Sequence, residues 1–151
     1  MADNNNTLVA NMPKSSHPDL KKLDRLVGTW KVSGPTIAGE VRFEQMEGGF
    51  FVIQHFDLTH EGRKIKGVEY IGFDQDTRTL RSRLMDNAGS NFVYTWDIAD
   101  DTLTIWFGDK GSDNFYRGKF NKDGDTNKGR WQWPESNGKI GGYESTMTRV
   151  K

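Results

Sequence analysis

The sequence predicts an all-β protein: an antiparallel up-and-down β-barrel of about ten strands, with one short N-terminal helix plugging an end. Apolar and polar residues alternate with a period of two from Gly28 to the end of the chain, which is typical of half-buried strands. The alternating segments are short, and Gly, Asn and Asp clusters separate them as tight turns. These connections leave no room for crossover helices, so neighbouring strands must be antiparallel. A meander of this length closes into a barrel or splits into a sandwich, and closure removes its edges.

A single helix precedes the strands. Ser15 or Ser16 can cap it, Pro18 suits its first turn, and Gly28 ends it. Its apolar residues share one face: Leu20, Leu23, Leu26 and Val27. We expect residues 1–16 to form a flexible tail and residues 17–151 to form a single barrel domain.

The strands are expected where the period-two pattern continues between turn signals. The expected strands are Thr29–Ser33, Ile37–Met46, Phe50–Leu58, Lys64–Phe73, Thr79–Asp86, Asn91–Ile98, Thr102–Phe107, Phe115–Phe120, Gly129–Trp133 and Tyr143–Val150. Alternation then assigns each side chain to the interior or the exterior of the barrel.

Several polar side chains fall in the inward phase of these strands. They are Gln54, Glu69, Tyr94, Tyr116 and Ser145. An apolar interior with a few convergent polar groups is typical of a ligand pocket. The alternative is structural: the tyrosines pack and hydrogen-bond internally, and a bulge turns Glu69 outward. Arg81 and Arg83 fall in the outward phase, although a register shift of one residue would make them a clamp for an anionic group.

Composition excludes several classes of function. The 151 residues include 21 Lys and Arg and 21 Asp and Glu, so the net charge is zero, which disfavours nucleic acid as the main partner. The chain has no cysteine, which excludes disulfides and thiolate metal sites. We expect no metal and no cofactor. We also expect no membrane partner and a cytoplasmic location, because we find no signal peptide or long apolar run.

The segment Leu26-Val27-Gly28-Thr29-Trp30 resembles the opening of lipocalin-like (calycin) barrels, in which a helix runs into Gly-x-Trp at the first strand. The rest of the chain is similar to a bacterial branch of that group and distantly similar to nitrobindin-like and fatty-acid-binding-protein-like barrels. The similar segments are Glu47-Gly48-Gly49-Phe50, Gly67 to Asp74, Asp86 with Gly89, Gly118-Lys119-Phe120, Gly129-Arg130-Trp131 and Met147-Thr148-Arg149. The resemblance implies that Trp30 packs beneath Arg149 and closes one end of the barrel, which is a structural role.

The resemblance to nitrobindin-like barrels also implies a way to bind haem, through a histidine late in the chain. This sequence departs from that pattern, because His17, His55 and His60 all precede residue 61. Haem binding is therefore disfavoured.

Three hypotheses for function follow. The first is non-enzymatic binding of a small apolar or amphipathic molecule in the barrel, with aromatic walls and two orienting polar groups; its residues are Tyr94, Trp96, Tyr116, Trp131, Gln54 and Glu69. The second is a small cofactor-independent isomerase or cyclase with Glu69 as a general base. The third places function on the outer face, as a homodimer contact formed by Phe51, Ile53, Val68, Trp106 and Phe115. The first is preferred, and catalytic residues stay unassigned.

Overall fold

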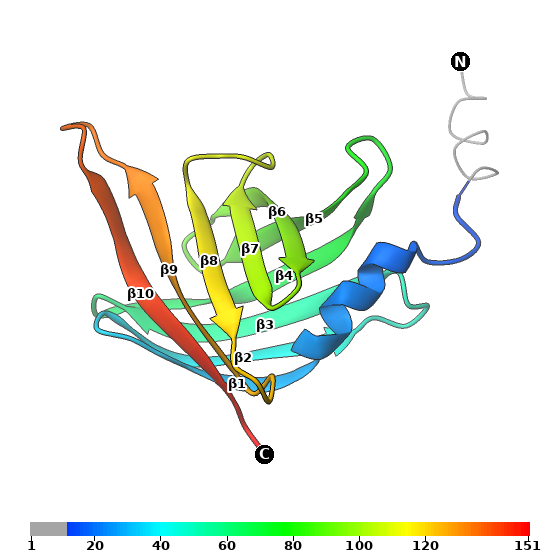
Figure 1. Ribbon diagram of the computed structural model, residues 1–151, viewed down its shortest axis with the longest axis horizontal. Coiled ribbons are helices and arrows are strands. Elements are labelled where there is room, and N and C mark those ends of the chain that lie inside the picture. The colour runs from blue at the N-terminus through cyan, green and yellow to red at the C-terminus, as the bar shows by residue number, and fades with distance from the viewer. Residues whose placement is uncertain (1–11) are drawn as a thin grey trace.

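The computed structural model describes residues 12–151, which form a closed barrel with every neighbouring strand pair antiparallel (Figure 1). The elements are a 3-10 helix η1 (Pro18–Leu26) and the strands β1 (Gly28–Ser33), β2 (Ile37–Gln45), β3 (Phe51–His60), β4 (Arg63–Asp74), β5 (Thr79–Asp86), β6 (Asn91–Ala99), β7 (Thr102–Phe107), β8 (Phe115–Phe120), β9 (Thr126–Pro134) and β10 (Ile140–Arg149). Consecutive strands pair in chain order, and β1 pairs with β10 to close the barrel. The all-β barrel expected from the sequence is confirmed. The proposed tail at residues 1–16 lies mostly outside the described residues, so the domain boundary stays a prediction.

All ten expected strands are present, but β9 and β10 each start three residues earlier than the pattern predicts, at Thr126 and at Ile140. The missed residues 126–128 are polar, so they carry no alternation signal. The turn before them is fixed by Asn121, whose Oδ1 accepts the backbone N–H groups of Asp125 (3.0 Å) and Thr126 (3.1 Å). Strand β9 therefore pairs with β8 directly after this turn.

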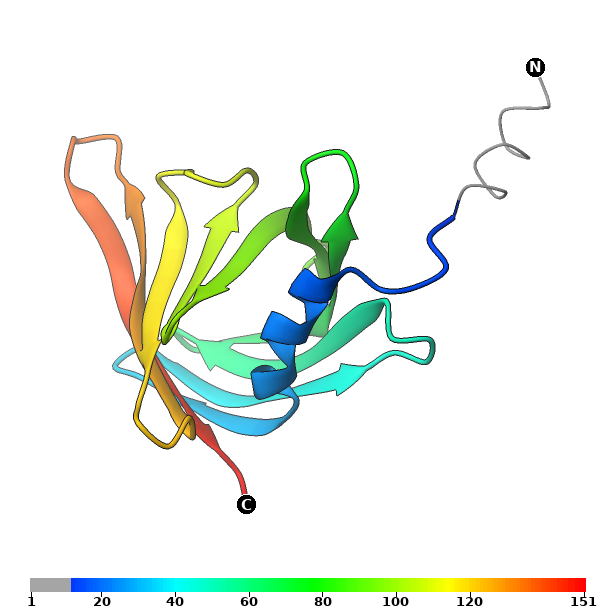
Figure 2. The ribbon, with the colours of Figure 1, turned by 45° about the vertical axis from the view of Figure 1, so that its right-hand side comes forward.

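The helix cap expected at Ser15 or Ser16 is wrong. Pro18 is the first residue of η1, so the cap position is His17, and its Nδ1 accepts the backbone N–H of Asp19 at 3.1 Å. The His17 ring also stacks on Phe73 of β4, with centroids 3.6 Å apart. The element is a 3-10 helix, and its buried residues Leu20, Leu23 and Leu26 join the barrel core. It lies across one opening of the barrel (Figure 2).

Trp30 and Arg149 face each other across the closing β1–β10 pair. The Arg149 guanidinium lies 4.2 Å from the centre of the fully buried Trp30 ring. It also donates to the carbonyls of Val27 (2.8 Å) and Arg25 (2.6 Å), while Trp30 Nε1 donates to the carbonyl of Leu26 (2.8 Å). A Cβ at Gly28, which has φ +128°, would come within 2.7 Å of Arg149 Nη1. Gly28 therefore permits both the strained backbone and the close approach of the arginine.

The expected apolar group on the outer face is not one continuous exposed patch. Trp106 faces outward but is only 8% exposed, with Lys110 Nζ 5.9 Å from its ring centre. Phe51 is exposed on β3, and the cross-strand row from it to Trp106 passes through Gly72, Arg81 and Thr95. The exposed apolar group around Phe51 is therefore separate from Trp106.

Candidate functional site

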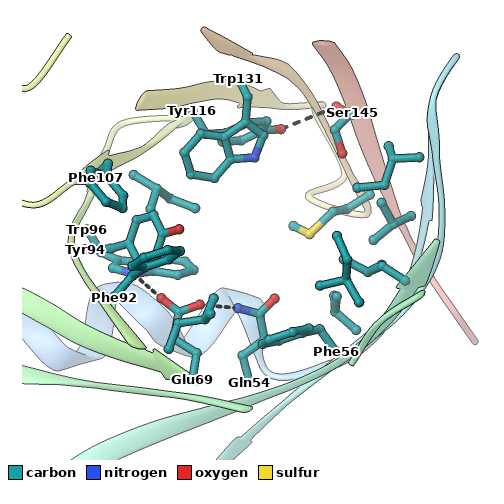
Figure 3. Close-up of a pocket in the computed structure, with 18 of the residues that line it drawn as sticks. Gln54, Phe56, Glu69, Phe92, Tyr94, Trp96, Phe107, Tyr116, Trp131 and Ser145 are labelled. Carbon is teal, nitrogen blue, oxygen red and sulfur yellow. Dashed lines mark hydrogen bonds between the residues drawn. The ribbon is translucent and has the colours of Figure 1, made fainter. Parts of the chain in front are cut away.

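The barrel encloses a cavity of about 650 Å³. Its wall is formed by inward residues of the strands, which include all five polar residues that alternation placed inside. Figure 3 shows these side chains projecting from several strands toward the same interior space. The outward turn of Glu69 that a bulge would have produced does not occur, because Glu69 is 3% exposed and pairs in regular register with Gln54.

A polar cluster surrounds Glu69 on one side of the cavity (Figure 3). Gln54 of β3 donates from Nε2 to Glu69 Oε1 at 2.8 Å. Ser82 of β5 donates from Oγ to Glu69 Oε2 at 2.5 Å, and Trp96 of β6 donates from Nε1 to the same oxygen at 3.1 Å. Trp96 Nε1 also lies 3.0 Å from Ser82 Oγ. Donors from three neighbouring strands therefore converge on one carboxyl group.

Burial raises the pKa of Glu69 to about 7, from an ordinary value of 4.5. Desolvation is the main cause, and the hydrogen bonds from Ser82, Trp96 and Gln54 act in the opposite direction. All three donors are neutral, so they lower the cost of the buried charge without balancing it. Near neutral pH the carboxyl group can therefore gain or lose a proton.

A second polar group lies on the wall formed by β8, β9 and β10. The Tyr116 hydroxyl donates to Asn127 Oδ1 at 2.7 Å and lies 3.5 Å from the carbonyl oxygen of Ser145. Asn127 is fully buried, and its Nδ2 has no hydrogen-bond partner among the described residues. A Cβ at Gly118 would overlap both the tyrosine hydroxyl and the asparagine oxygen, so glycine is needed there.

Aromatic rings link the two polar groups along the cavity wall. The Tyr94 ring meets Phe107 at 5.5 Å and Trp131 at 6.0 Å, both edge to face. Trp131 continues to Tyr116, with ring centres 5.7 Å apart. Burial also raises the pKa of Tyr94, and the nearby charge of Glu69 adds to the effect. The Tyr94 hydroxyl therefore stays protonated at neutral pH.

The lipocalin-like domain model matches residues 26–126, about two thirds of the 151-residue chain. The chain belongs to the lipocalin-like domain family. The matched region runs from the end of η1 to the start of β9, so this lipocalin-like barrel is closed by two strands beyond the match.

The lipocalin-like barrel is also similar in fold to the crystal structure of Rv2717c from M. tuberculosis. The two share 15% sequence identity with a TM-score of 0.55, over 91% of this chain and 100% of the other. This likeness shows the fold alone. No curated protein sequence matches the chain. The helix in the described part of the chain is too short to cross a membrane.

The sequence pattern selected residues that line the cavity of the lipocalin-like barrel, but it missed some of their hydrogen-bond partners. Gln54, Glu69, Tyr94, Trp96, Tyr116 and Trp131 all line the cavity. Ser82 shares the inward phase of its strand, but the sequence does not connect it with Glu69, because the contact runs diagonally across the β4–β5 ladder. Asn127 was missed, because the expected strand began only at Gly129, two residues after it. Whether these residues bind a ligand stays a prediction.

The histidines of the described chain are not placed to bind haem in the way that the resemblance to nitrobindin-like barrels implies. None of the three histidines is among the cavity-lining residues within the described chain. His55 faces outward, with its Nε2 3.3 Å from Glu44 Oε1, and His60 packs against Tyr143 with ring centres 4.3 Å apart. Among residues 12–151, no group of three or more His, Cys, Asp or Glu side chains is placed to hold a metal ion.

Proposed function

We propose that this lipocalin-like barrel binds a small apolar or amphipathic molecule in its cavity and does not transform it. The observation that carries the proposal is the cavity of about 650 Å³, with aromatic and aliphatic walls and few polar groups. Ligand pockets have volumes of about 300–1,000 Å³ and are mostly apolar, with a few polar groups that fix orientation. A closed barrel of this size has room for one small ligand.

Each predicted site residue has a part in this proposal. Trp131, Tyr116 and Tyr94 form a continuous aromatic wall that excludes water from an apolar ligand. Gln54 and Glu69 form the polar side that orients it, and Trp96 holds the Glu69 carboxyl group in place. The family supports this assignment in general terms, because lipocalin-like barrels bind small hydrophobic ligands, but it does not name the ligand.

Native mass spectrometry of gently purified protein tests the proposal first. We expect an adduct that dissociates on unfolding and gives the mass of the ligand. If the protein is purified empty, titration with the neutral apolar fluorophore N-phenyl-1-naphthylamine should give saturable binding. An empty mass together with no saturable binding of the fluorophore would contradict the proposal.

A matched pair of substitutions locates the binding. Met147 of β10 lines the cavity, and the neighbouring Thr148 is exposed on the outside. Met147→Trp fills part of the cavity, so it should weaken fluorophore binding by about tenfold or more. Thr148→Trp should leave it unchanged. Equal effects of the two substitutions would place the fluorophore on the outer surface.

A second candidate function is acid–base catalysis by Glu69, favoured by its buried position on the cavity wall and its pKa of about 7. A general base works best with a pKa near the working pH. Incubation of the identified ligand with protein in deuterated water, followed by NMR, tests this. Catalysis predicts deuterium uptake or rearrangement that Glu69→Gln abolishes, whereas a simple binding protein returns the ligand unchanged.

The homodimer also stays a prediction. Of the five residues that the sequence assigned to its contact, only Phe51 is exposed, and the exposed Tyr70 and Met85 on β4 and β5 extend this apolar group. Sedimentation velocity of the wild type and of Tyr70→Glu distinguishes the states: a dimer through this face should dissociate in the variant.

A further inference from the structure

The charged residues on the cavity wall have one sign. The cavity-lining residues within the described chain include two carboxylic acids, Glu69 and Asp86, and no lysine, arginine or histidine. The two nearest arginines along β5 face outward: Arg81 Nη1 donates to Asp109 Oδ1 at 2.9 Å and Arg83 Nη1 to Asn91 Oδ1 at 2.8 Å. The clamp for an anionic group that a shifted register would have made is therefore absent from the wall.

The groups of the Glu69 cluster that are free to bond a ligand are mainly hydrogen-bond acceptors. Ser82 and Trp96 both use their donors on Glu69 Oε2, and Gln54 uses one N–H of its Nε2 on Oε1. The carbonyl oxygen of Gln54 then lies on the opposite side of its amide, toward the interior (Figure 3). Glu69 Oε1 accepts from Gln54 and keeps further acceptor capacity. The cluster thus offers a ligand two acceptor oxygens, on Glu69 and Gln54, and the one remaining N–H of Gln54.

Aromatic rings surround the space next to this cluster. Trp96 contacts Glu69 directly, and Phe92, Tyr94 and Phe107 follow on β6 and β7, with Phe92 5.3 Å from Phe107 and Tyr94 5.5 Å from Phe107. The faces of aromatic rings are electron-rich and attract a desolvated cation within about 6 Å of a ring centre. A carboxylate in the same place would be repelled by both the rings and Glu69.

We propose that the cavity selects amphipathic organic cations, with a primary or secondary ammonium group that donates to Glu69 Oε1 and Gln54 Oε1. This inference rests on the proposed binding function. The apolar part of such a ligand lies along the wall of Tyr116, Trp131 and Met147. The ammonium N–H groups take up the spare acceptors, and the positive charge balances a carboxylate that only neutral donors now contact. Fatty acids are disfavoured, because the described residues that line the cavity include two carboxylic acids and no positive side chain to meet their head group.

Other titratable groups near Glu69 do not supply this balance. The tyrosine nearest to it, Tyr94 of β6, stays protonated. Asp86 of β5 lines the cavity and adds a negative charge, while its Oδ1 accepts the backbone N–H groups of Ala88 and Ser90, each at 2.9 Å. Gln54, Ser82 and Trp96, which contact Glu69 from β3, β5 and β6, carry no charge. When Glu69 is ionised, the ligand would therefore supply the balancing positive charge.

Three probes with the same chain test the selectivity: decylamine, decan-1-ol and decanoate, each titrated by calorimetry into the full chain at about pH 8. We expect the amine to bind about tenfold or more tightly than the alcohol, and the carboxylate to bind least. If the alcohol binds and the carboxylate binds as tightly as the amine, the proposed cavity binding stands and the cation selectivity is overturned. If none of the three binds, the proposed function itself fails.

Two carboxyl-to-amide variants locate the selectivity. Glu69→Gln should weaken decylamine binding about tenfold and leave decan-1-ol binding within about twofold, because the cavity shape is kept. A glutamine can still accept from Ser82 and Trp96, and Gln54 can rotate its amide to pair with it, so we expect the variant to fold. Glu40→Gln, on the exposed outer side of β2, removes the same charge from the surface and should change nothing. Unchanged amine binding in Glu69→Gln would overturn the inference.

Discussion

Two charged side chains of this barrel, the partly buried Arg149 and the buried Glu69, differ in how the protein balances their charge. At the closing β1–β10 pair, Arg149 lies on the Trp30 ring, donates to two backbone carbonyls, and has Asp125 Oδ1 3.3 Å from its Nε. At the polar cluster, Glu69 receives three neutral donors and, among the described residues, no positively charged partner. The first charge is balanced within the protein, and the second is not.

The difference separates a structural role from a binding role. The Arg149 cluster satisfies its donors with protein acceptors and joins the end of η1 to the last strand, so it has little capacity left for a ligand. The Glu69 cluster lies on the cavity wall and has free hydrogen-bond acceptors. The pKa of its carboxyl group is raised. Uncompensated polar groups of this kind tend to occur at functional sites.

The largest effect is expected at the closing pair. Trp30→Ala removes a fully buried indole and the surface on which Arg149 lies. Truncating a buried tryptophan costs about 3–5 kcal/mol, which for a chain of this length lowers the Tm by roughly 10 °C. Thermal unfolding followed by circular dichroism measures it. An unchanged Tm would show that the Trp30–Arg149 contact contributes nothing to closure.

An intermediate effect is expected at Glu69, with a defined dependence on pH. Its pKa rises from 4.5 to about 7 on folding, so the folded state binds the proton more tightly than the unfolded state. The stabilising contribution of the protonated form is complete below about pH 4.5 and is lost as the pH rises through about 7. The difference between the two pKa values corresponds to roughly 3 kcal/mol.

Urea unfolding of the wild type and of Glu69→Gln across this range measures the contribution. We expect the free energy of unfolding to fall more steeply with rising pH in the wild type, and the variant to be the more stable protein above about pH 7. Glu40→Gln is the matched surface control and should follow the wild type. Parallel pH profiles for the wild type and Glu69→Gln would show that burial does not perturb this carboxyl group.

The sequence predicted the barrel and the inward residues because both depend on alternation. A strand inverts its faces at every residue, so Phe56 and Trp96 fix the phase of Gln54 and Tyr94 without further information. The same rule placed Glu69 inside, because it is the one polar residue in an otherwise apolar inward phase of its strand. Regular ladders kept these assignments correct, since no bulge disturbs the pairing of Glu69 with Gln54.

The contacts that give Glu69 its properties could not be predicted in the same way. Ser82 and Trp96 reach one carboxyl oxygen from two different strands, and that geometry depends on cross-strand register, which alternation does not determine. Asn127 was missed because the expected strand began only at Gly129, although Trp131 in the same strand has the phase that places Asn127 inside. His17 was missed as the helix cap because its ring accepts a bond that serine or aspartate more commonly accepts.

The smallest effect is expected at the neutral polar group formed by Tyr116 and Asn127, on the cavity wall opposite Glu69. Tyr116→Phe removes the hydroxyl that donates to Asn127 Oδ1 and leaves a fully buried amide with one partner fewer. Leaving a buried acceptor unsatisfied costs about 1–3 kcal/mol, with no dependence on pH between 4.5 and 7, because neither side chain titrates there. Urea unfolding at both ends of that range measures it. A loss that grows with pH would instead couple Tyr116 to Glu69 through the aromatic wall, and the two polar groups of the cavity would then have to be treated as a single site.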